Sequence, residues 1–181
     1  GRERVEVLNE FSLPNPYNER NFEGFSLQVF DADVLAVWAW RGKNRAPARI
    51  YWGLLAPARD KVSLQGSMPV KAPWPVVCRV PTGEGCEIRH VSDLRVSAKG
   101  VLYIAAAADP GNDGPFDSAV YVAGRFHRKG NKFRLQLLSP LTELRRFADS
   151  KVEAIEILRD HPRAMVFGSD DENQGGSIYV D

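Results

Sequence analysis

The chain has 181 residues, a formal net charge of +1, and 44% hydrophobic and 26% charged residues. These values predict one folded domain over residues 1–181, large enough to bury a core without a metal or a disulfide. The balanced charge excludes a strong field that would attract nucleic acid. The longest apolar run, residues 101–108, is far too short to span a bilayer, so no membrane span is expected.

The sequence says little about the compartment. No signal peptide is visible, but the chain begins at Gly1, so a leader could already have been removed. Cys78 and Cys86 flank a turn-rich loop. One interpretation is a disulfide, which would suit an oxidising compartment, and the other is two free thiols. The sequence therefore slightly favours a periplasmic or secreted location.

One pattern occurs three times along the chain. The segment 22–27 returns at 91–96 and at 152–157, and each copy is followed by a turn, an aliphatic run, a polar loop and a third strand-like run. Repeats about 60 residues apart predict a β-propeller, so the expected fold is all-β. The expected strands are 22–30, 34–41, 49–55 and 61–67 in the first repeat, 91–97, 101–107, 118–124 and 132–138 in the second, and 152–158, 164–168 and 177–180 in the third.

The third repeat has three strands where the others have four. Residues 4–13 resemble the strand at 132–138, so we expect this N-terminal strand to complete the last blade. The chain then holds three four-stranded blades, whereas propellers typically have about 4–8. Either two chains form a six-bladed ring as a homodimer, or the chain is a piece of a longer propeller. The dimer is favoured because a fragment would need two cuts that leave complementary ends.

One short helix is predicted between the second and third repeats. Ser139 can cap it, Pro140 suits its first turn, and Leu141, Leu144 and Phe147 would form one apolar face. The connection over residues 69–89 holds four prolines and is expected to be irregular.

The segment 22–27 resembles the first-strand motif of phytase-like esterases and of the SdiA-regulated type of bacterial propellers. The segment 168–179 is similar to the turn between second and third strands in those propellers. The later repeats depart from the motif, with Ser92-Asp93 and Glu153-Ala154 in place of Glu-Gly. The resemblance implies a propeller fold, and an esterase-like activity only as one option, because one fold hosts many functions.

The first strands of propeller blades line the central channel, which places three acidic residues at one mouth of it. Glu23, Asp93 and Glu153 are therefore the candidate catalytic residues. A ring of carboxylates can bind a divalent cation or hold an acid with a raised pKa. The structural alternative is that these carboxylates accept hydrogen bonds from neighbouring backbone N–H groups.

Loops expected at the same face supply the other candidates. Three adjacent acids follow the second strand of the last repeat and are the candidate metal ligands, with calcium as the expected ion or a nearby arginine as the alternative counter-charge. A basic loop, one histidine and one tryptophan are the candidate ligand-binding residues. The metal candidates are Asp170, Asp171 and Glu172, and the ligand-binding candidates are Arg41, Lys43, Arg45, His90 and Trp74.

No zinc-peptidase, nucleophile-elbow, phosphate-loop or Cys-x-x-Cys motif is present. The expected function is therefore the binding of a small-molecule or peptide-like ligand at the carboxylate-rich channel mouth of a propeller. Its enzymatic version is an ester or phosphoester hydrolase, assisted by calcium. The alternative is a non-catalytic protein-interaction scaffold.

Overall fold

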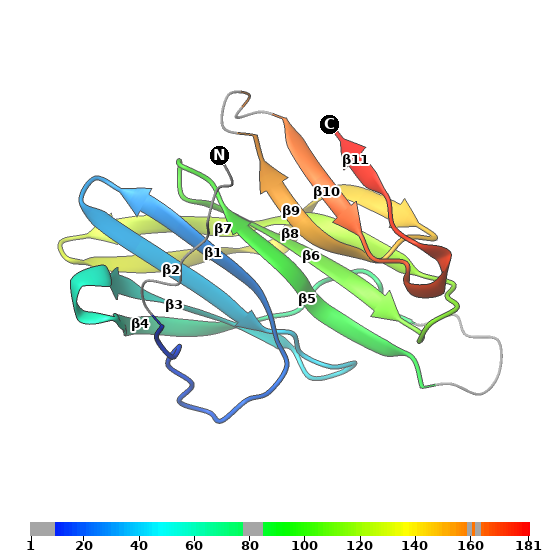
Figure 1. Ribbon diagram of the computed structural model, residues 1–181, viewed down its shortest axis with the longest axis horizontal. Coiled ribbons are helices and arrows are strands. Elements are labelled where there is room, and N and C mark those ends of the chain that lie inside the picture. The colour runs from blue at the N-terminus through cyan, green and yellow to red at the C-terminus, as the bar shows by residue number, and fades with distance from the viewer. Residues whose placement is uncertain (1–9, 78–84, 159–160, 162–163) are drawn as a thin grey trace, which may run out of the picture.

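The computed structural model describes residues 10–77, 85–158, 161 and 164–181, and it confirms the all-β prediction. The described residues form three antiparallel sheets (Figure 1). Their only helical elements are two 3-10 turns, Pro57–Arg59 and Glu172–Gln174. None of the described residues forms a helix with the length and apolarity needed to cross a membrane.

Each sheet is a meander in which strands follow one another in chain order. Some strands alternate more and less buried side chains, as a half-buried strand does, and others are buried along most of their length. The first sheet holds β1 (Phe22–Phe30), β2 (Asp33–Trp40), β3 (Ala48–Ala56) and β4 (Lys61–Val70); the second holds β5 (Glu87–Val96), β6 (Val101–Asp109), β7 (Asp117–Lys129) and β8 (Lys132–Ala148); the third holds β9 (Val152–Ile157), β10 (Met165–Ser169) and β11 (Ile178–Val180).

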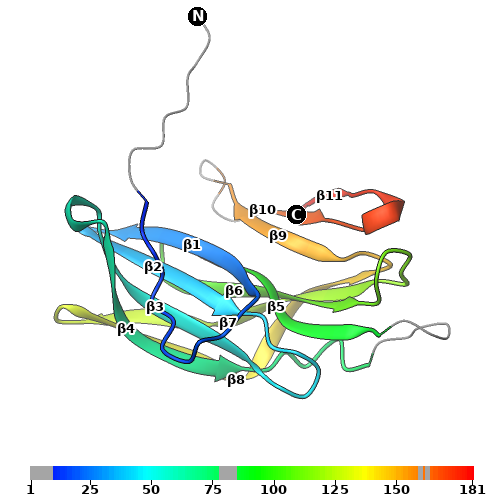
Figure 2. The same cartoon turned by 60° about the horizontal axis from the view of Figure 1, so that its bottom comes forward.

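The first strands of the three sheets lie side by side. β5 packs between β1 and β9, and the three sheets extend away from this line (Figures 1 and 2). Side chains on one first strand bond to the backbone of the next. Ser26 Oγ accepts from Val96 N at 3.1 Å, and Asp93 Oδ2 accepts from Ile155 N at 2.6 Å. The starts of β1, β5 and β9 are therefore held at one end of the molecule.

Two apolar cores separate the sheets. The larger core lies between the first and second sheets and includes Ile50, Trp52, Leu94 and Ile104. The second lies between the second and third sheets and is centred on Phe167. The second sheet, in the middle of the stack, is thus buried on both faces, which explains the continuous apolar run of β6.

The outward face of the first sheet is only partly covered. Phe11 and Leu13 pack on Trp38 and its neighbours there, and these N-terminal residues form no strand. The rest of the expected N-terminal strand, residues 4–9, lies outside the described residues. The three sheets contain four, four and three strands, and one chain shows no closed ring.

The helix predicted after Ser139 is wrong, because β8 continues to Ala148. The ladder between β7 and β8 pairs Gly124 with Leu137 and then Val122 with Thr142, so residues 138–141 form a bulge opposite one residue of β7. A bulge tolerates a proline, which has no N–H to give to a ladder. Phe147 is buried in the second core, where strand pairing outweighs the local helix signal.

Gly24 sets how closely β1 approaches β5. Its φ is 74°, and it lies at a bulge in the pairing of β1 with β2. A Cβ at this position would lie 2.7 Å from Leu94 N and 3.0 Å from the carbonyl carbon of Asp93. Both the left-handed φ and the backbone contact require glycine.

Gly24→Ala should therefore lower the free energy of unfolding by more than about 2 kcal/mol, because strain and overpacking add. Gly130→Ala is the matched control, since Gly130 has a φ of 61° but nothing within 4 Å of an added Cβ. It should lose only about 1 kcal/mol. Urea denaturation measures both values, and equal losses would contradict the close approach of β1 to β5.

Candidate functional site

Ion pairs join the starts of the three first strands. Arg89 on β5 occupies the centre of this network: its Nη1 lies 2.7 Å from Glu153 Oε1 on β9 and 3.8 Å from Glu23 Oε1 on β1. Its Nη2 also pairs with Asp109 at the end of β6. One guanidinium thus pairs with carboxylates that come from all three sheets. We call the residues joined in this way the mouth network; its members are Glu23, Arg41, Lys43, Glu87, Arg89, Asp109, Lys151, Glu153 and Glu172.

The basic loop between β2 and β3 extends the network toward the first sheet. Arg41 Nη2 lies 2.8 Å from Glu87 Oε2, and its Nη1 lies 3.5 Å from Glu23 Oε1. Lys43 pairs with the other oxygen of Glu87. Arg41, Lys43 and Glu87 also line a hollow of about 330 Å³ at this edge of the face.

Lys151 extends the network toward the third sheet. Its side chain is buried, pairs with Glu172, and lies 3.5 Å from Glu153 Oε1. Burial alone would lower the pKa of Lys151, but its contacts with Glu172, Glu153 and Asp109 outweigh burial and raise it. Lys151 therefore stays charged and compensates the acids around it.

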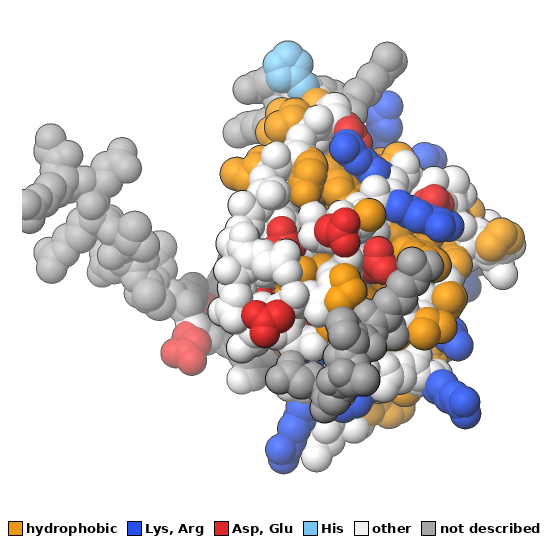
Figure 3. All heavy atoms as spheres, turned by 90° about the vertical axis from the view of Figure 1, so that its right-hand side faces the viewer, with side chains coloured by type: hydrophobic (Ala, Val, Ile, Leu, Met, Phe, Trp, Pro, Cys, Tyr) orange, Lys and Arg blue, Asp and Glu red, His pale blue; other side chains and the backbone are white. Residues whose placement is uncertain are grey.

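Two of the three candidate catalytic acids meet in this network. Glu23 and Glu153 share Arg89, as the shared face of the first strands predicts. The pKa of Glu153 is raised overall, because burial outweighs the opposing charges of Lys151 and Arg89. Figure 3 looks onto this end of the molecule and shows acidic side chains toward the middle of the face, with basic ones mostly nearer its rim.

Asp93 has a different environment. Its carboxylate accepts from the backbone N–H of Ile155 on β9 and forms no ion pair among the described residues. Burial raises the pKa of Asp93 to about 6, although the bonds from Ile155 N and Leu94 N hold it down. The geometry matches the structural alternative, in which this carboxylate joins two first strands.

The three candidate metal ligands have protein partners. Asp171 accepts from Lys151 N at 2.7 Å and from Ser169 Oγ at 2.8 Å, Asp170 accepts from Glu172 N at 3.2 Å, and Glu172 pairs with Lys151. Within the described residues, no group of three or more His, Cys, Asp or Glu is arranged to hold a metal ion. A calcium site stays a prediction.

The remaining ligand-binding candidates divide into two environments. Arg45 and His90 line a pocket that lies beside the mouth network. Trp74 lies elsewhere, with its ring 4.8 Å from the guanidinium carbon of Arg146 and its backbone bonded to Tyr121 Oη. Arg45 and His90 are therefore placed for a ligand, whereas the bonds of Trp74 hold the connection after β4 on the second sheet.

The two cysteines bear on the same region. Cys86 lines the pocket and is disulfide-bonded. Cys78, the other half of the bridge expected from the sequence, lies outside the described residues. The bond to Cys86 agrees with the disulfide interpretation and does not identify a compartment.

Sequence reasoning missed the two cations that matter most in the network. Arg89 and Lys151 each lie within two residues of a repeated first-strand motif, and that position is the signal that would have placed them in the mouth network.

No protein-family model, curated protein or solved structure matches the chain. The resemblance to phytase-like esterases and SdiA-regulated propellers therefore stays a prediction.

The buried carboxylate of Asp93 predicts a specific dependence of stability on pH. The folded protein binds this proton more tightly than the unfolded chain does, because the pKa rises from 3.8 to about 6. Protonation of Asp93 therefore contributes roughly 3 kcal/mol to the free energy of unfolding. This contribution is fully present below about pH 4 and is lost as the pH rises through 6.

Asp93→Asn should remove this loss, since the amide oxygen still accepts from Ile155 N but cannot ionise. Its stability relative to the natural protein should rise between pH 4 and pH 7 in urea denaturation. Asp93→Ala is the control, because it leaves the N–H of Ile155 unpaired and costs roughly 1–3 kcal/mol more than the Asn variant at every pH. Parallel pH curves for the natural protein and the Asn variant would contradict this account.

Proposed function

We propose that the chain forms half of a six-bladed β-propeller, which a second copy completes, and that the ring is a non-catalytic binding scaffold. The observation that carries this proposal is the exposure of one apolar pair. Phe25 and Leu27 on β1 are 43% and 42% exposed. The corresponding residues of β5, Leu94 and Val96, are 1% and 2% exposed.

The difference between the two pairs has a simple cause. Leu94 and Val96 pack on the first sheet, and Ile155 and Ile157, the corresponding residues of β9, pack on the second. Only β1 has no sheet in front of it within the described residues. An exposed apolar face of this kind marks an interaction surface. We call it the front face; its residues are Phe25, Leu27, Val29 and Leu64.

The third sheet exposes apolar side chains on the side that faces away from the second sheet. Ile178 and Val180 on β11 are 77% and 65% exposed. The pairing of β10 with β11 places both on the side of the sheet away from Phe167, together with Val166. We call this the rear face. In the first and second sheets, third-strand residues such as Ile50 and Val120 pack on the sheet that follows.

Three tyrosines support the same repeat. Tyr51, Tyr121 and Tyr179 occupy the third strand of each sheet, and each hydroxyl bonds to the segment that precedes its own sheet. Their partners are Glu19 for Tyr51, the backbone of Trp74 for Tyr121, and Ser150 Oγ for Tyr179. A front face is thus built in the same way three times.

A second copy is the partner that fits both faces at once. Each chain has one front face and one rear face, so two chains related by a twofold axis satisfy all four, and six sheets lie within the usual size of a propeller. β11 also lacks a strand on its outer edge among the described residues. We propose that the N-terminal strand of the second copy pairs there and removes the free edge.

Binding, rather than hydrolysis, is the chemistry that the mouth network supports. Glu23 and Glu153 are each within ion-pair distance of Arg89, and Glu153 also of Lys151. A general acid or base needs a pKa matched to its task and access to the substrate proton. Carboxylates compensated by cations instead give a fixed pattern of charge around a channel, which suits a small polar or peptide-like ligand.

Analytical ultracentrifugation tests the ring. The natural protein should sediment as a dimer at micromolar concentration, and Leu27→Glu or Ile178→Glu should each produce a folded monomer, because a buried charge on either face costs several kcal/mol. Leu144→Glu is the control, since Leu144 is exposed on β8, outside both faces. It should remain a dimer.

A natural protein that stays monomeric would overturn the ring. The non-catalytic part has its own test: a p-nitrophenyl acetate or phosphate hydrolysis rate above buffer that falls in Glu153→Gln would overturn it. Because the first result concerns mass and the second concerns turnover, the two parts of the proposal fail separately.

A further inference from the structure

A pocket of about 380 Å³ lies between the first and second sheets, beside the mouth network but lined by different residues. Its walls come from the loop after β2, the segment after β4 and the start of β5. Its volume falls in the range of small-molecule sites, about 300–1,000 Å³. Its described lining residues include Asn44, Arg45, Lys71, Val76, Val77 and His90.

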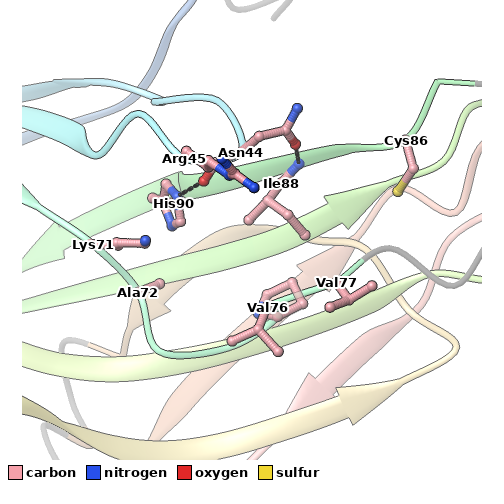
Figure 4. A pocket seen from close by; sticks show the side chains of 10 residues that line it. Asn44, Arg45, Lys71, Ala72, Val76, Val77, Cys86, Ile88 and His90 are labelled. Atoms are coloured by element: carbon pink, nitrogen blue, oxygen red, sulfur yellow. Dashed lines mark hydrogen bonds between the residues drawn. The ribbon is translucent and has the colours of Figure 1, made fainter.

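The walls of the pocket differ in polarity. Figure 4 shows Val76 and Val77 on the opposite side from Arg45 and His90. Both valines are largely exposed, although they are apolar. The polar side carries two cations, Arg45 and Lys71, and none of the described lining residues is acidic. Neither cation forms an ion pair with any described residue, in contrast to the cations of the mouth network. This arrangement favours an anionic group attached to an apolar body.

His90 adds an acceptor to the same wall. It is buried, and its Nε2 lies 2.6 Å from the carbonyl oxygen of Asn44. A carbonyl oxygen only accepts, so Nε2 carries the proton and Nδ1 holds the lone pair. Nδ1 has no hydrogen-bond partner among the described residues. A buried acceptor without a partner is costly, and a ligand that donates to it would recover that cost.

The charge state of His90 supports this assignment. Burial lowers the pKa of His90, and the charge of Lys71 lowers it further, while the bond that His90 donates to the Asn44 carbonyl oxygen opposes the shift. The imidazole is therefore neutral at pH 7, and its Nδ1 can accept a hydrogen bond.

We propose that this pocket binds a small 2-hydroxy carboxylic acid with a branched aliphatic chain. The carboxylate lies with Arg45 and Lys71, the hydroxyl donates to His90 Nδ1, and the aliphatic chain packs on Val76 and Val77. Lys71 and Arg45 repel an ammonium group, which selects a hydroxyl over an amine at the carbon next to the carboxylate. Binding at this pocket requires neither the ring nor the mouth network, so the proposal is independent of the proposed function.

Isothermal titration calorimetry at pH 7 with four compounds of one carbon skeleton tests the proposal. 2-Hydroxy-4-methylpentanoate should bind with a Kd of about 1 mM or tighter. 4-Methylpentanoate lacks the hydroxyl and should bind at least about tenfold more weakly, because His90 Nδ1 stays unpaired. 4-Methylpentanol and leucine should bind more weakly still.

Two variants and a matched control locate the site. Arg45→Gln and Lys71→Gln should each weaken the binding of 2-hydroxy-4-methylpentanoate at least about tenfold. Lys99→Gln makes the same change at an exposed turn outside the pocket and should leave the Kd unchanged. The ¹⁵N resonance of His90 Nδ1 should also shift toward that of a hydrogen-bonded nitrogen when the ligand is added.

The proposal is overturned by any of three results. These are no heat of binding at 10 mM ligand (roughly ten times the expected Kd), equal affinity for the compound without the hydroxyl or without the carboxylate, or equal affinity in the Arg45, Lys71 and Lys99 variants. Circular dichroism of each variant distinguishes a lost site from a lost fold, and a second substitution, Lys71→Arg, should keep binding because it keeps the charge.

Discussion

The constraint on which the rest of the structure depends is that each first strand must bury its apolar pair on the sheet in front of it. Leu94 and Val96 of β5 do so on the first sheet, and Ile155 of β9 does so on the second. This packing draws β1, β5 and β9 into one line and leaves Phe25 of β1 exposed. Burying a side chain of this size is worth roughly 1.5–3 kcal/mol, so an unpaired front face is a strong reason for association.

The same line of strands explains the charges at the mouth. Strands that start at one end bring Glu23 and Glu153 within reach of a single guanidinium, that of Arg89. Acids held so close repel one another unless cations compensate them, and Lys151 and Arg41 supply two more cations. The mouth network is therefore a fixed pattern of charge, while Arg45 and Lys71 of the neighbouring pocket form no ion pair with any described residue. The two sites differ in what they offer a ligand, although β5 and the loop after β2 contribute to both.

The sequence predicted the sheets well because alternating and continuously apolar runs both reflect burial, which repeats with each copy. It predicted that Glu23 and Glu153 would meet, because that follows from topology alone. It missed Arg89 and Lys151, because their acidic partners lie on other strands and become neighbours only when the sheets pack together. The helix after Ser139 was wrong for a related reason: local propensity favoured it, and the pairing of β8 with β7 overrode it. The tautomer of His90, whose Nδ1 has no partner among the residues that the structure describes, is set by a tertiary contact with Asn44 and has no sequence signal.

Cross-linking between single-cysteine variants tests the front-to-rear packing most directly. Leu27→Cys places a thiol on the front face and Val180→Cys places one on the rear face, and Cys86 is already disulfide-bonded. If a second copy completes the ring, a mixture of the two variants should give a covalent dimer with a short bifunctional maleimide, and neither variant alone should do so. A covalent dimer from Leu27→Cys alone would show front-to-front packing, and no dimer from the mixture would show that the faces do not meet; either result would contradict the account.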